Sequence, residues 1–510
     1  MVDIPEQPVQ PETAKPQGRR KLKLVNRQQT TVAVIDVEEL IAEDHKARAI
    51  WELTGRMDLS GFEEPLRTTV GCVGRAAWDP RLLVSIWVYA YSEGISSARE
   101  VERLMQWERG LQWLGGLESV NHHSLSDFRV EHKAALDELF AQLLAMLEGA
   151  GLVDLKQVMH DGSKIQAQAG GSSLRREKTL RERLQEAQKL VAGMGDPEAD
   201  APARNRQQAA RERAARERSE RLEAALKEME TLQEEKRSEE EKAKVRVSPH
   251  EPEARLMKHG DNAIVPSYNA QISTDAANKI IVGASLSQCS SDAQSLMAAI
   301  EKVASNLGRK PLQVVADGGF TNRSNIKACA ALPIDFVGSL PDPEERSAAA
   351  MKSKGIAPEF APKAFRILND GKMLECPAGC HLVRLRKNRK RDDLYQQYRA
   401  RGEDCKACPH QLKCCPHKPE QGRTVSIRLE EAAEVAEFRK KMEGEDYQAT
   451  YRKRSEVAEF PNAWIKEKLG LRKFRVRGLV KAGSELLWAC LTYNIMQWAR
   501  LAWHPLAAAA

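Results

Sequence analysis

Residues 311–317, Pro-Leu-Gln-Val-Val-Ala-Asp, decide the fold expected of this chain. The run is almost continuously apolar, ends in Asp317 and is followed by Gly318 and Gly319. Such a run is typical of a parallel strand that is buried on both faces and stops at a functional site. It predicts an α/β protein with Asp317 at the end of a central strand.

Strand-like and helical patterns surround this run. Residues 156–166 indicate a short strand with Asp161 in its middle, and residues 268–274 and 279–287 indicate a hairpin. The other expected elements are two helices and a last strand, at 292–306, 322–331 and 334–340. The order strand, insertion, strand, strand, helix, strand, helix, strand predicts a mixed sheet.

The segment before the sheet is helical. Residues 32–150 carry helical patterns and enough Leu and Trp to bury a core of their own. Pro80 opens one expected helix, Ser96 can cap the next, and a long helix is expected from 123 or 124 to 147. These residues predict an all-α N-terminal domain.

Two insertions interrupt the sheet. Residues 172–247 are dominated by Arg, Glu, Lys and Ala and predict a charged helical hairpin with only a weak apolar seam. Residues 341–445 contain prolines, a basic stretch at 384–391 and six of the ten cysteines. Clustered cysteines in a reducing compartment indicate metal ligation rather than disulfides.

Composition limits the location and the partners. The 510 residues are too many for one core, and a net charge of +7 is compatible with a polyanionic partner. Residues 1–31 are rich in proline and end in a basic run, which predicts a disordered basic arm. No segment approaches the roughly 20 apolar residues of a membrane span, and the N-terminus lacks the apolar core of a signal peptide. A cytoplasmic protein without a membrane partner is therefore expected.

Asp161, Asp317 and Glu459 stand at three separate places around the expected sheet. Carboxylates brought close together repel each other, and hard cations that take oxygen ligands relieve the repulsion. The set therefore predicts a Mg²⁺ (or Mn²⁺) site. Two such ions can activate a water or a 3′-hydroxyl for in-line attack on a phosphodiester. Lys466, seven residues after Glu459 and on the same helical face, would contact a phosphate.

Pro461 disturbs the helix that is expected to carry Glu459. It follows Glu459 by two residues and removes a backbone hydrogen bond, so the helix is expected to kink or restart there. Glu456 consequently stays open as an alternative third carboxylate. Val457, Phe460 and Trp464 fall on the opposite side of this helix and are expected to pack on the core.

The cysteine cluster has paired spacing. It reads Cys376-x3-Cys380, Cys405-x2-Cys408 and Cys414-Cys415, with His410 and His417 nearby. This spacing predicts a tetrahedral zinc site, while an iron–sulfur cluster and reduced structural thiols remain alternatives. The surrounding Arg and Lys residues indicate contact with a DNA backbone.

At this point the sequence resembles the DD-E transposases of bacterial insertion sequences, in the group with a Tyr-x2-Arg-x3/4-Glu-x6-Lys signature. Tyr451, Arg454, Glu459 and Lys466 match the form with four residues between Arg and Glu. Further matching strings are GRAAWDP (74–80), SLSDFR (124–129), HDGSKI (160–165), PEARLM (252–257), YNAQ (268–271), ADGGF (316–320) and RGL (477–479). The resemblance covers most of the chain after the arm.

The resemblance implies a ribonuclease-H-like core that cuts transposon ends with Mg²⁺ and joins the freed 3′-ends to target DNA. It assigns the metal to Asp161, Asp317 and Glu459, and the DNA ends to Tyr451, Arg454 and Lys466. We expect the basic segment after this helix to bind DNA as well, through Arg472, Lys473, Arg475 and Arg477. The family pattern favours Cys376, Cys405, Cys408 and Cys414 as the zinc ligands.

The predicted organisation has eight parts. They are a basic arm (1–31), a helical DNA-binding domain for the terminal inverted repeats (32–150), the first core strand (151–171), the charged hairpin (172–247), the rest of the core (248–340), the Cys-rich insertion (341–445), the helix of the third carboxylate with the basic segment (446–482) and a C-terminal helix (483–510).

The predicted function is that of a DNA transposase associated with the nucleoid, acting on double-stranded transposon ends and target as a homodimer or higher oligomer. One alternative is a catalytically inactive DNA-binding or regulatory protein derived from a transposase. Another is a structural or repressor role through oligomerisation of the charged hairpin.

Overall fold

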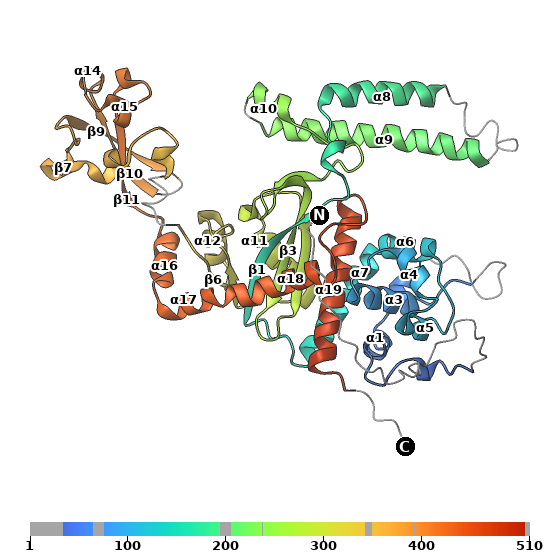
Figure 1. Cartoon of the computed structure of the whole chain (residues 1–510). Coiled ribbons are helices and arrows are strands. Elements are labelled where there is room, and N and C mark those ends of the chain that lie inside the picture. Colours follow the sequence, from blue (N-terminus) through green and yellow to red (C-terminus); the bar gives the residue numbers. More distant parts are fainter. Residues whose placement is uncertain are drawn as a thin grey trace, which may run out of the picture.

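The computed structural model describes residues 34–64, 76–193, 206–236, 238–341, 349–390 and 393–504. The predicted basic arm, residues 1–31, lies outside these ranges. Figure 1 shows a central sheet with the N-terminal helices on one side, while a helical hairpin and a Cys-rich module project from the sheet. In the described part of the chain, no helix is long and apolar enough to cross a membrane.

The N-terminal helices follow their capping residues. Asp79 accepts a hydrogen bond from the Arg81 amide at the start of α3, and Pro80 occupies the first turn, as its fixed φ favours. Ser97 caps α4, whereas the predicted cap, Ser96, uses its carbonyl to bind Arg129. The α-helices described in this region are α1 (Lys46–Thr54), α2 (Ser60–Glu63), α3 (Pro80–Ser92), α4 (Ala98–Leu104), α5 (Arg109–Leu114), α6 (His122–Glu131) and α7 (Lys133–Gly149). The long helix expected up to residue 147 is divided between α6 and α7 at His132.

The central sheet is mixed. Its strands are β1 (Gln157–Gln166), β2 (Arg255–Lys258), β3 (Ile264–Asp275), β4 (Ile281–Ser287), β5 (Gln313–Ala316) and β6 (Asp335–Val337). Strand β1 pairs antiparallel with β3 and parallel with β5, β3 pairs with β2 and β4, and β6 continues the parallel side. The short strand β2 was not predicted. The expected alternation of strands and helices is otherwise present.

Two helices pack against the sheet, α11 (Leu296–Leu307) mainly on β4 and α12 (Arg323–Ala330) on β6. Helix α11 starts four residues later than predicted, because the 3-10 turn Asp292–Gln294 precedes it. Helix α12 begins after the loop that follows β5, with Asn322 as its N-cap. Phe320 and Ile326 bury their side chains with Val314 of β5, which fixes this loop against the sheet.

Helix α19 (Leu479–Leu501) joins the helical domain to the sheet. It contacts α3, α7 and β4, and its Trp488 belongs to a hydrophobic core that includes Trp87 of α3 and Ile281 of β4. The Asn494 side chain binds both the amide and the carbonyl of Ile281, at 2.9 and 2.8 Å. The helical domain therefore shares its core with α19 and the sheet instead of closing one of its own.

The charged segment forms a projecting pair of helices (Figure 1). Helices α8 (Glu177–Ala192) and α9 (Arg206–Glu234) pack along each other, and the short helix α10 (Glu239–Lys244) follows. A small core is buried between them, made of Leu180, Ala187, Leu222, Ala225, Leu226, Met229 and Val247. This core is larger than the weak seam that the sequence indicated.

The Cys-rich module contains a five-stranded antiparallel sheet, which was not predicted. Its strands are β7 (Arg366–Leu368), β8 (Met373–Glu375), β9 (His381–Lys390), β10 (Asp393–Ala400) and β11 (Thr424–Glu430), in the order β11-β10-β9-β8-β7. The short helices α14 (Gly402–Lys406) and α15 (Gln411–Cys414) lie in the long connection between β10 and β11. Helices α16 (Ala433–Met442) and α17 (Glu445–Arg452) return the chain to the core (Figure 1).

Candidate active site

The register of the central sheet brings Asp161 and Asp317 together. In the parallel pair of β1 and β5, His160 lies opposite Ala316, so the next residues along the two strands are the two aspartates. Neighbouring strands are about 4.8 Å apart, and residues in register point to the same face of a sheet. Two carboxylates that are 156 positions apart in the sequence numbering therefore lie side by side.

The loop after β5 holds Asp317 in place. Its Oδ1 accepts hydrogen bonds from the amides of Gly319 at 2.7 Å and Phe320 at 3.3 Å. Its carbonyl accepts the hydroxyl of Thr321 at 2.8 Å. Since one carboxylate oxygen is used by the loop, Oδ2 is the atom that can serve a ligand.

The third carboxylate stands at the break that Pro461 predicted. Residues Ser455–Glu459 form a π-helical turn, and α18 (Phe460–Glu467) restarts with Pro461 in its first turn. The wider turn suits a proline, which has no amide hydrogen to donate, and such bulges are common at functional sites. Val457 is buried as predicted, whereas 39% of the Phe460 surface is exposed, so the expected apolar stripe is only partly buried.

The contacts of the two candidate glutamates differ. Glu456 is exposed and forms an ion pair with Lys279 at 2.9 Å, and this partner lowers the pKa of Glu456. Glu459 lies 3.8 Å from Arg454, and its charge contributes to a raised pKa of Asp161. Of the two glutamates, Glu459 is therefore the one whose charge acts on Asp161.

Three polar side chains from the same stretch surround Asp161. The Asn462 amide donates to Asp161 Oδ2 at 3.0 Å, and Arg454 Nη1 lies 3.9 Å from Oδ1. Burial lowers the pKa of Lys466, and the charge of Asp161 opposes this shift, so Lys466 lies near enough to be influenced by that carboxylate. The Tyr451 ring lies 5.9 Å from the Arg454 guanidinium.

Burial raises the pKa of Asp161 to about 6. The charges of Asp317 and Glu459 add to the shift, while Arg454 opposes it. The donors are all oxygen atoms and carry like charges, a chemistry that suits a hard divalent cation. As placed in the described part of the chain, no three Asp, Glu, His or Cys side chains form a group that could hold a metal ion.

A fourth carboxylate, which the sequence did not indicate, lies beside this site. Asp292 Oδ1 accepts hydrogen bonds from Asn269 at 2.7 Å and Gln271 at 3.0 Å. It also lies so close to Gly162 that a Cβ at position 162 would collide with it. The sequence predicted Asp292 only as the start of a helix, because its place against Gly162 depends on the pairing of β1 with β3.

The buried His160 holds the side chain of Gln271, which in turn binds Asp292. Its ring nitrogens lie 2.9 Å from Ser273 Oγ and 2.9 Å from Gln271 Oε1. Burial lowers the pKa of His160 to about 4, so the ring is neutral at pH 7. A neutral histidine here fixes the Gln271 side chain that binds Asp292.

The basic segment continues beside the end of β1. The Gln166 amide binds the carbonyl of Arg472 at 3.2 Å, and the Phe474 amide binds the carbonyl of Gln166 at 2.9 Å. The side chains of Arg472, Arg475 and Arg477 are exposed and that of Lys473 is partly exposed. The predicted DNA-binding cations thus lie at the end of the strand that carries Asp161.

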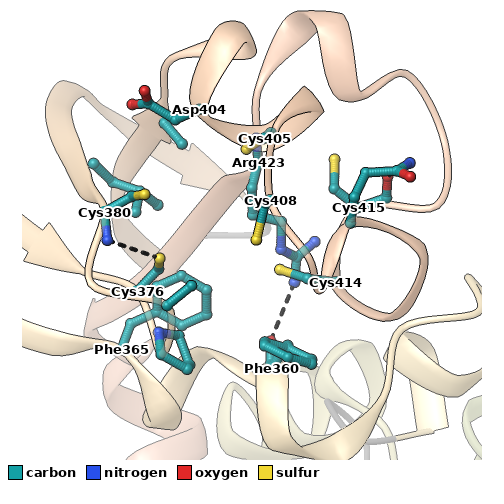
Figure 2. Close-up of a pocket in the computed structure, with 15 residues that line it drawn as sticks. Phe360, Phe365, Cys376, Cys380, Asp404, Cys405, Cys408, Cys414, Cys415 and Arg423 are labelled. Atoms are coloured by element: carbon teal, nitrogen blue, oxygen red, sulfur yellow. Dashed lines mark hydrogen bonds between the residues drawn. The ribbon is translucent and has the colours of Figure 1, made fainter.

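All six clustered cysteines line one pocket in the Cys-rich module (Figure 2). Backbone amides donate to two of the sulfurs: that of Cys380 to Cys376 Sγ, and that of Arg423 to Cys405 Sγ, both at 3.3 Å. The Cys415 thiol instead donates to the carbonyl of His417 at 3.7 Å. Cys415 is therefore engaged away from the other thiols.

Burial raises the pKa of four thiols in this pocket, those of Cys380, Cys405, Cys414 and Cys415. The pKa of Cys414 is about 11, mainly because the thiol is buried; the neighbouring cysteines add to the rise and Arg423 opposes it. Metal binding would have to displace the thiol protons. Cys376, Cys405, Cys408 and Cys414 offer four sulfur donors around one space, which fits a soft or borderline metal in donor type. The zinc site itself stays a prediction.

Two family models match parts of the chain. Residues 35–131 match a transposase domain (DUF772), and residues 375–499 match a transposase DDE domain. The first match covers the N-terminal helices up to α6, and the second runs from the Cys-rich module through Glu459 into α19. No curated protein matches the chain. The two matches support a transposase family for this protein.

Proposed function

We propose that the protein is a DNA transposase of the DD-E group that cuts transposon ends and joins them to target DNA. The observation that supports this proposal is the register of β1 and β5, which puts Asp161 next to Asp317, together with the charge of Glu459 acting on Asp161. The strand order supports a ribonuclease-H-like core, because β1 lies between antiparallel β3 and parallel β5. The match to a transposase DDE domain supports the same class.

In this proposal Asp161, Asp317 and Glu459 hold Mg²⁺, or Mn²⁺ in its place. The bound cation supplies positive charge to the scissile phosphate and lowers the pKa of an attacking water or 3′-hydroxyl. Arg454 and Lys466 lie near Asp161 and bind phosphate oxygens of the DNA end. Asn462 orients Asp161 through its hydrogen bond, which leaves the second carboxylate oxygen to the cation.

The remaining parts take roles in DNA binding. The N-terminal helices recognise the terminal inverted repeats, and the exposed cations of residues 472–477 contact the backbone next to the site. A homodimer or higher oligomer on double-stranded DNA would bring the two ends of the element together. These assignments place the protein at the nucleoid.

A nicking assay tests the proposal. The substrate is a supercoiled plasmid that carries the DNA flanking the gene, and the proteins are the wild type, Asp317→Asn and Glu456→Gln. We expect nicking that requires Mg²⁺ or Mn²⁺ in the wild type and in Glu456→Gln, and its loss in Asp317→Asn with DNA binding retained. Binding without any nicking by the wild type would instead support the inactive regulatory protein.

We propose in addition that Cys376, Cys405, Cys408 and Cys414 bind zinc. Cys415 is less suited, because its thiol is directed to the His417 carbonyl. Metal analysis of the purified protein should find one zinc per chain, and Cys408→Ser should lose it while Cys415→Ser keeps it. Iron with bound sulfide would identify an iron–sulfur cluster, and no metal in freshly purified protein would leave structural thiols.

A further inference from the structure

Strand β9 of the Cys-rich module carries a dense row of positive charge. Its sequence is His-Leu-Val-Arg-Leu-Arg-Lys-Asn-Arg-Lys, with five Arg or Lys residues and no acidic residue. Arg384, Arg386, Lys387 and Arg389 are all exposed. Arg386, Lys387 and Arg389 form no ion pair with any described residue. Uncompensated cations repel one another, so such a row is costly unless it serves an anionic partner.

The irregular register of β9 gathers three of these cations, Arg384, Lys387 and Arg389, on one face. Arg386 lies in the bulge between Arg384 and Lys387. Arg384 lies opposite Tyr398 and Lys387 opposite Gln396, so two residues of β9 face one residue of β10. Because of this bulge, Lys387 and Arg389 lie on the same face of the strand as Arg384. In a regular strand they would lie on the opposite face. Two residues along a strand span about 7 Å, which is close to the rise of two phosphates along one DNA strand.

A buried ionic network connects the end of the β9–β10 strand pair to the helices that pack on the central sheet. Asp393, the first residue of β10, is 1% exposed and forms an ion pair with Arg323. It also accepts hydrogen bonds from the Ala432 amide at 3.0 Å and the Tyr395 hydroxyl at 3.2 Å. Glu431 adds a contact to Arg323 at 3.2 Å.

This anchor determines where the cations lie. Arg323 opens α12, six positions after Asp317. Helices α12 and α16 lie between the module and the central sheet (Figure 1). Because Lys390 pairs with Asp393, the end of β9 that carries Lys387 and Arg389 is the end nearest to the core. The row of charge therefore leads from the module toward the loop of Asp317.

We propose that β9 binds the phosphate backbone of double-stranded DNA whose scissile strand enters the carboxylate site. The inference rests on the proposed function and assigns a DNA-contacting surface that lies outside the signature residues. Backbone binding follows from the residue types, because a row of Arg and Lys on a strand neutralises phosphates without reading sequence. Its energetic signature is a strong dependence of affinity on salt.

The test compares full-length proteins on a duplex of random sequence at several salt concentrations. The variant is Arg386→Ala, Lys387→Ala and Arg389→Ala together. The matched control is Lys352→Ala, Lys354→Ala and Lys372→Ala, which removes three exposed lysines from other parts of the same module. Each phosphate contact contributes about one unit to the slope of log affinity against log salt. We expect the β9 variant to lose about two to three units of slope and at least about tenfold in affinity.

Two further comparisons keep the outcome clear. A variant with Arg386→Lys, Lys387→Arg and Arg389→Lys keeps the charge and should bind as the wild type does, which separates charge from folding. Unchanged affinity and slope in the alanine variant would overturn the assignment of β9, while binding by the wild type would leave the proposed function standing. Failure of the wild type to bind any duplex would contradict the proposed function itself. An acidic protein captured by β9 with no loss of DNA affinity would also overturn the proposal.

Discussion

The carboxyl of Asp161, one of the three candidate metal ligands, is buried and has a raised pKa. Its carboxyl has a pKa of about 6, above the ordinary 3.8, mainly because it is buried. Between about pH 4 and pH 6 the folded protein holds this proton while the unfolded chain releases it. This group therefore lowers the free energy of unfolding as the pH rises through that window.

The pH dependence gives the first prediction. In EDTA at pH 7, Asp161→Asn should be more stable than the wild type by about 2 kcal/mol, because no charge is buried. The difference should shrink as the pH falls below about 6 and vanish at about pH 3, where the wild-type carboxyl is protonated in both states. Urea unfolding at a series of pH values measures it. A difference that does not change with pH would contradict the raised pKa.

The orientation of the two glutamates gives the second prediction. Glu459→Gln should abolish metal-dependent nicking, since the charge of Glu459 acts on Asp161. Glu456→Gln should keep it, because the Glu456 side chain is used by Lys279 on the surface. The nicking rates of the two purified variants show which glutamate is the third carboxylate, and DNA binding serves as the control for folding. Equal loss in both variants would show that the π-helical turn does not select the carboxylate.

The sequence indicated the three carboxylates and the nearby Arg454 and Lys466, but not Asp292 or Asn462. Asp161 and Asp317 were recognised because a carboxylate in or directly after an apolar strand indicates a functional site. Glu459 was recognised through the Tyr-x2-Arg-x3/4-Glu-x6-Lys signature. Asp292 and Asn462 gave no such signal. The first depends on strand register and the second on the π-helical turn, and neither follows from local residue preferences.

At the scale of single elements, the break before α18 places Glu459. The sequence predicted a kink from Pro461, but the form of the break is a π-helical turn. The number of residues per turn depends on how Val457 and Ala458 pack against the sheet. The local sequence gives no information about this packing. The strands of the Cys-rich module were missed for a similar reason: cysteine spacing and basic residues conceal the weak alternation of short strands.

Restoring the missing backbone amide gives the third prediction. Pro461→Ala would let the helix close a regular turn, and one residue of phase rotates a side chain by about 100°. We expect nicking to fall by about 10- to 100-fold, because small misplacements of catalytic groups carry such losses. DNA binding and the circular dichroism spectrum should stay close to those of the wild type.

Pro358→Ala, in a short 3-10 helix of the Cys-rich module, provides a control for the general effect of removing a proline. Wild-type nicking by Pro461→Ala would contradict a positioning role for the break. Loss of nicking in both proline variants would point to general destabilisation instead.

At the scale of the whole molecule, α19 makes the helical domain and the sheet one structural unit. Trp488 is 1% exposed, and its indole donates to the carbonyl of Arg129 at 3.1 Å. Each part was foreseen from the sequence as a separate unit, because apolar periodicity shows which face is buried but not against which partner. The shared core could be found only from the packing.

This packing gives the fourth prediction. Trp488→Ala should lower the free energy of unfolding by about 3 to 5 kcal/mol, as expected for a large buried aromatic side chain. The helical domain and the sheet should unfold together at the lower denaturant concentration, which limited proteolysis along the transition would reveal. Trp107→Ala, at a position that is 55% exposed, should change little. A helical domain that survives unfolding of the sheet would contradict the shared core.

The central claim is that Asp161, Asp317 and Glu459 form one divalent-metal site. Titration of Mn²⁺ into the metal-free protein, followed by electron paramagnetic resonance, tests it without requiring a DNA substrate. We predict binding by the wild type and by Glu456→Gln, and affinity that is at least about tenfold weaker in Asp161→Asn, Asp317→Asn and Glu459→Gln, because each loses an oxygen ligand and its charge. Equal Mn²⁺ affinity in all five proteins would contradict the claim.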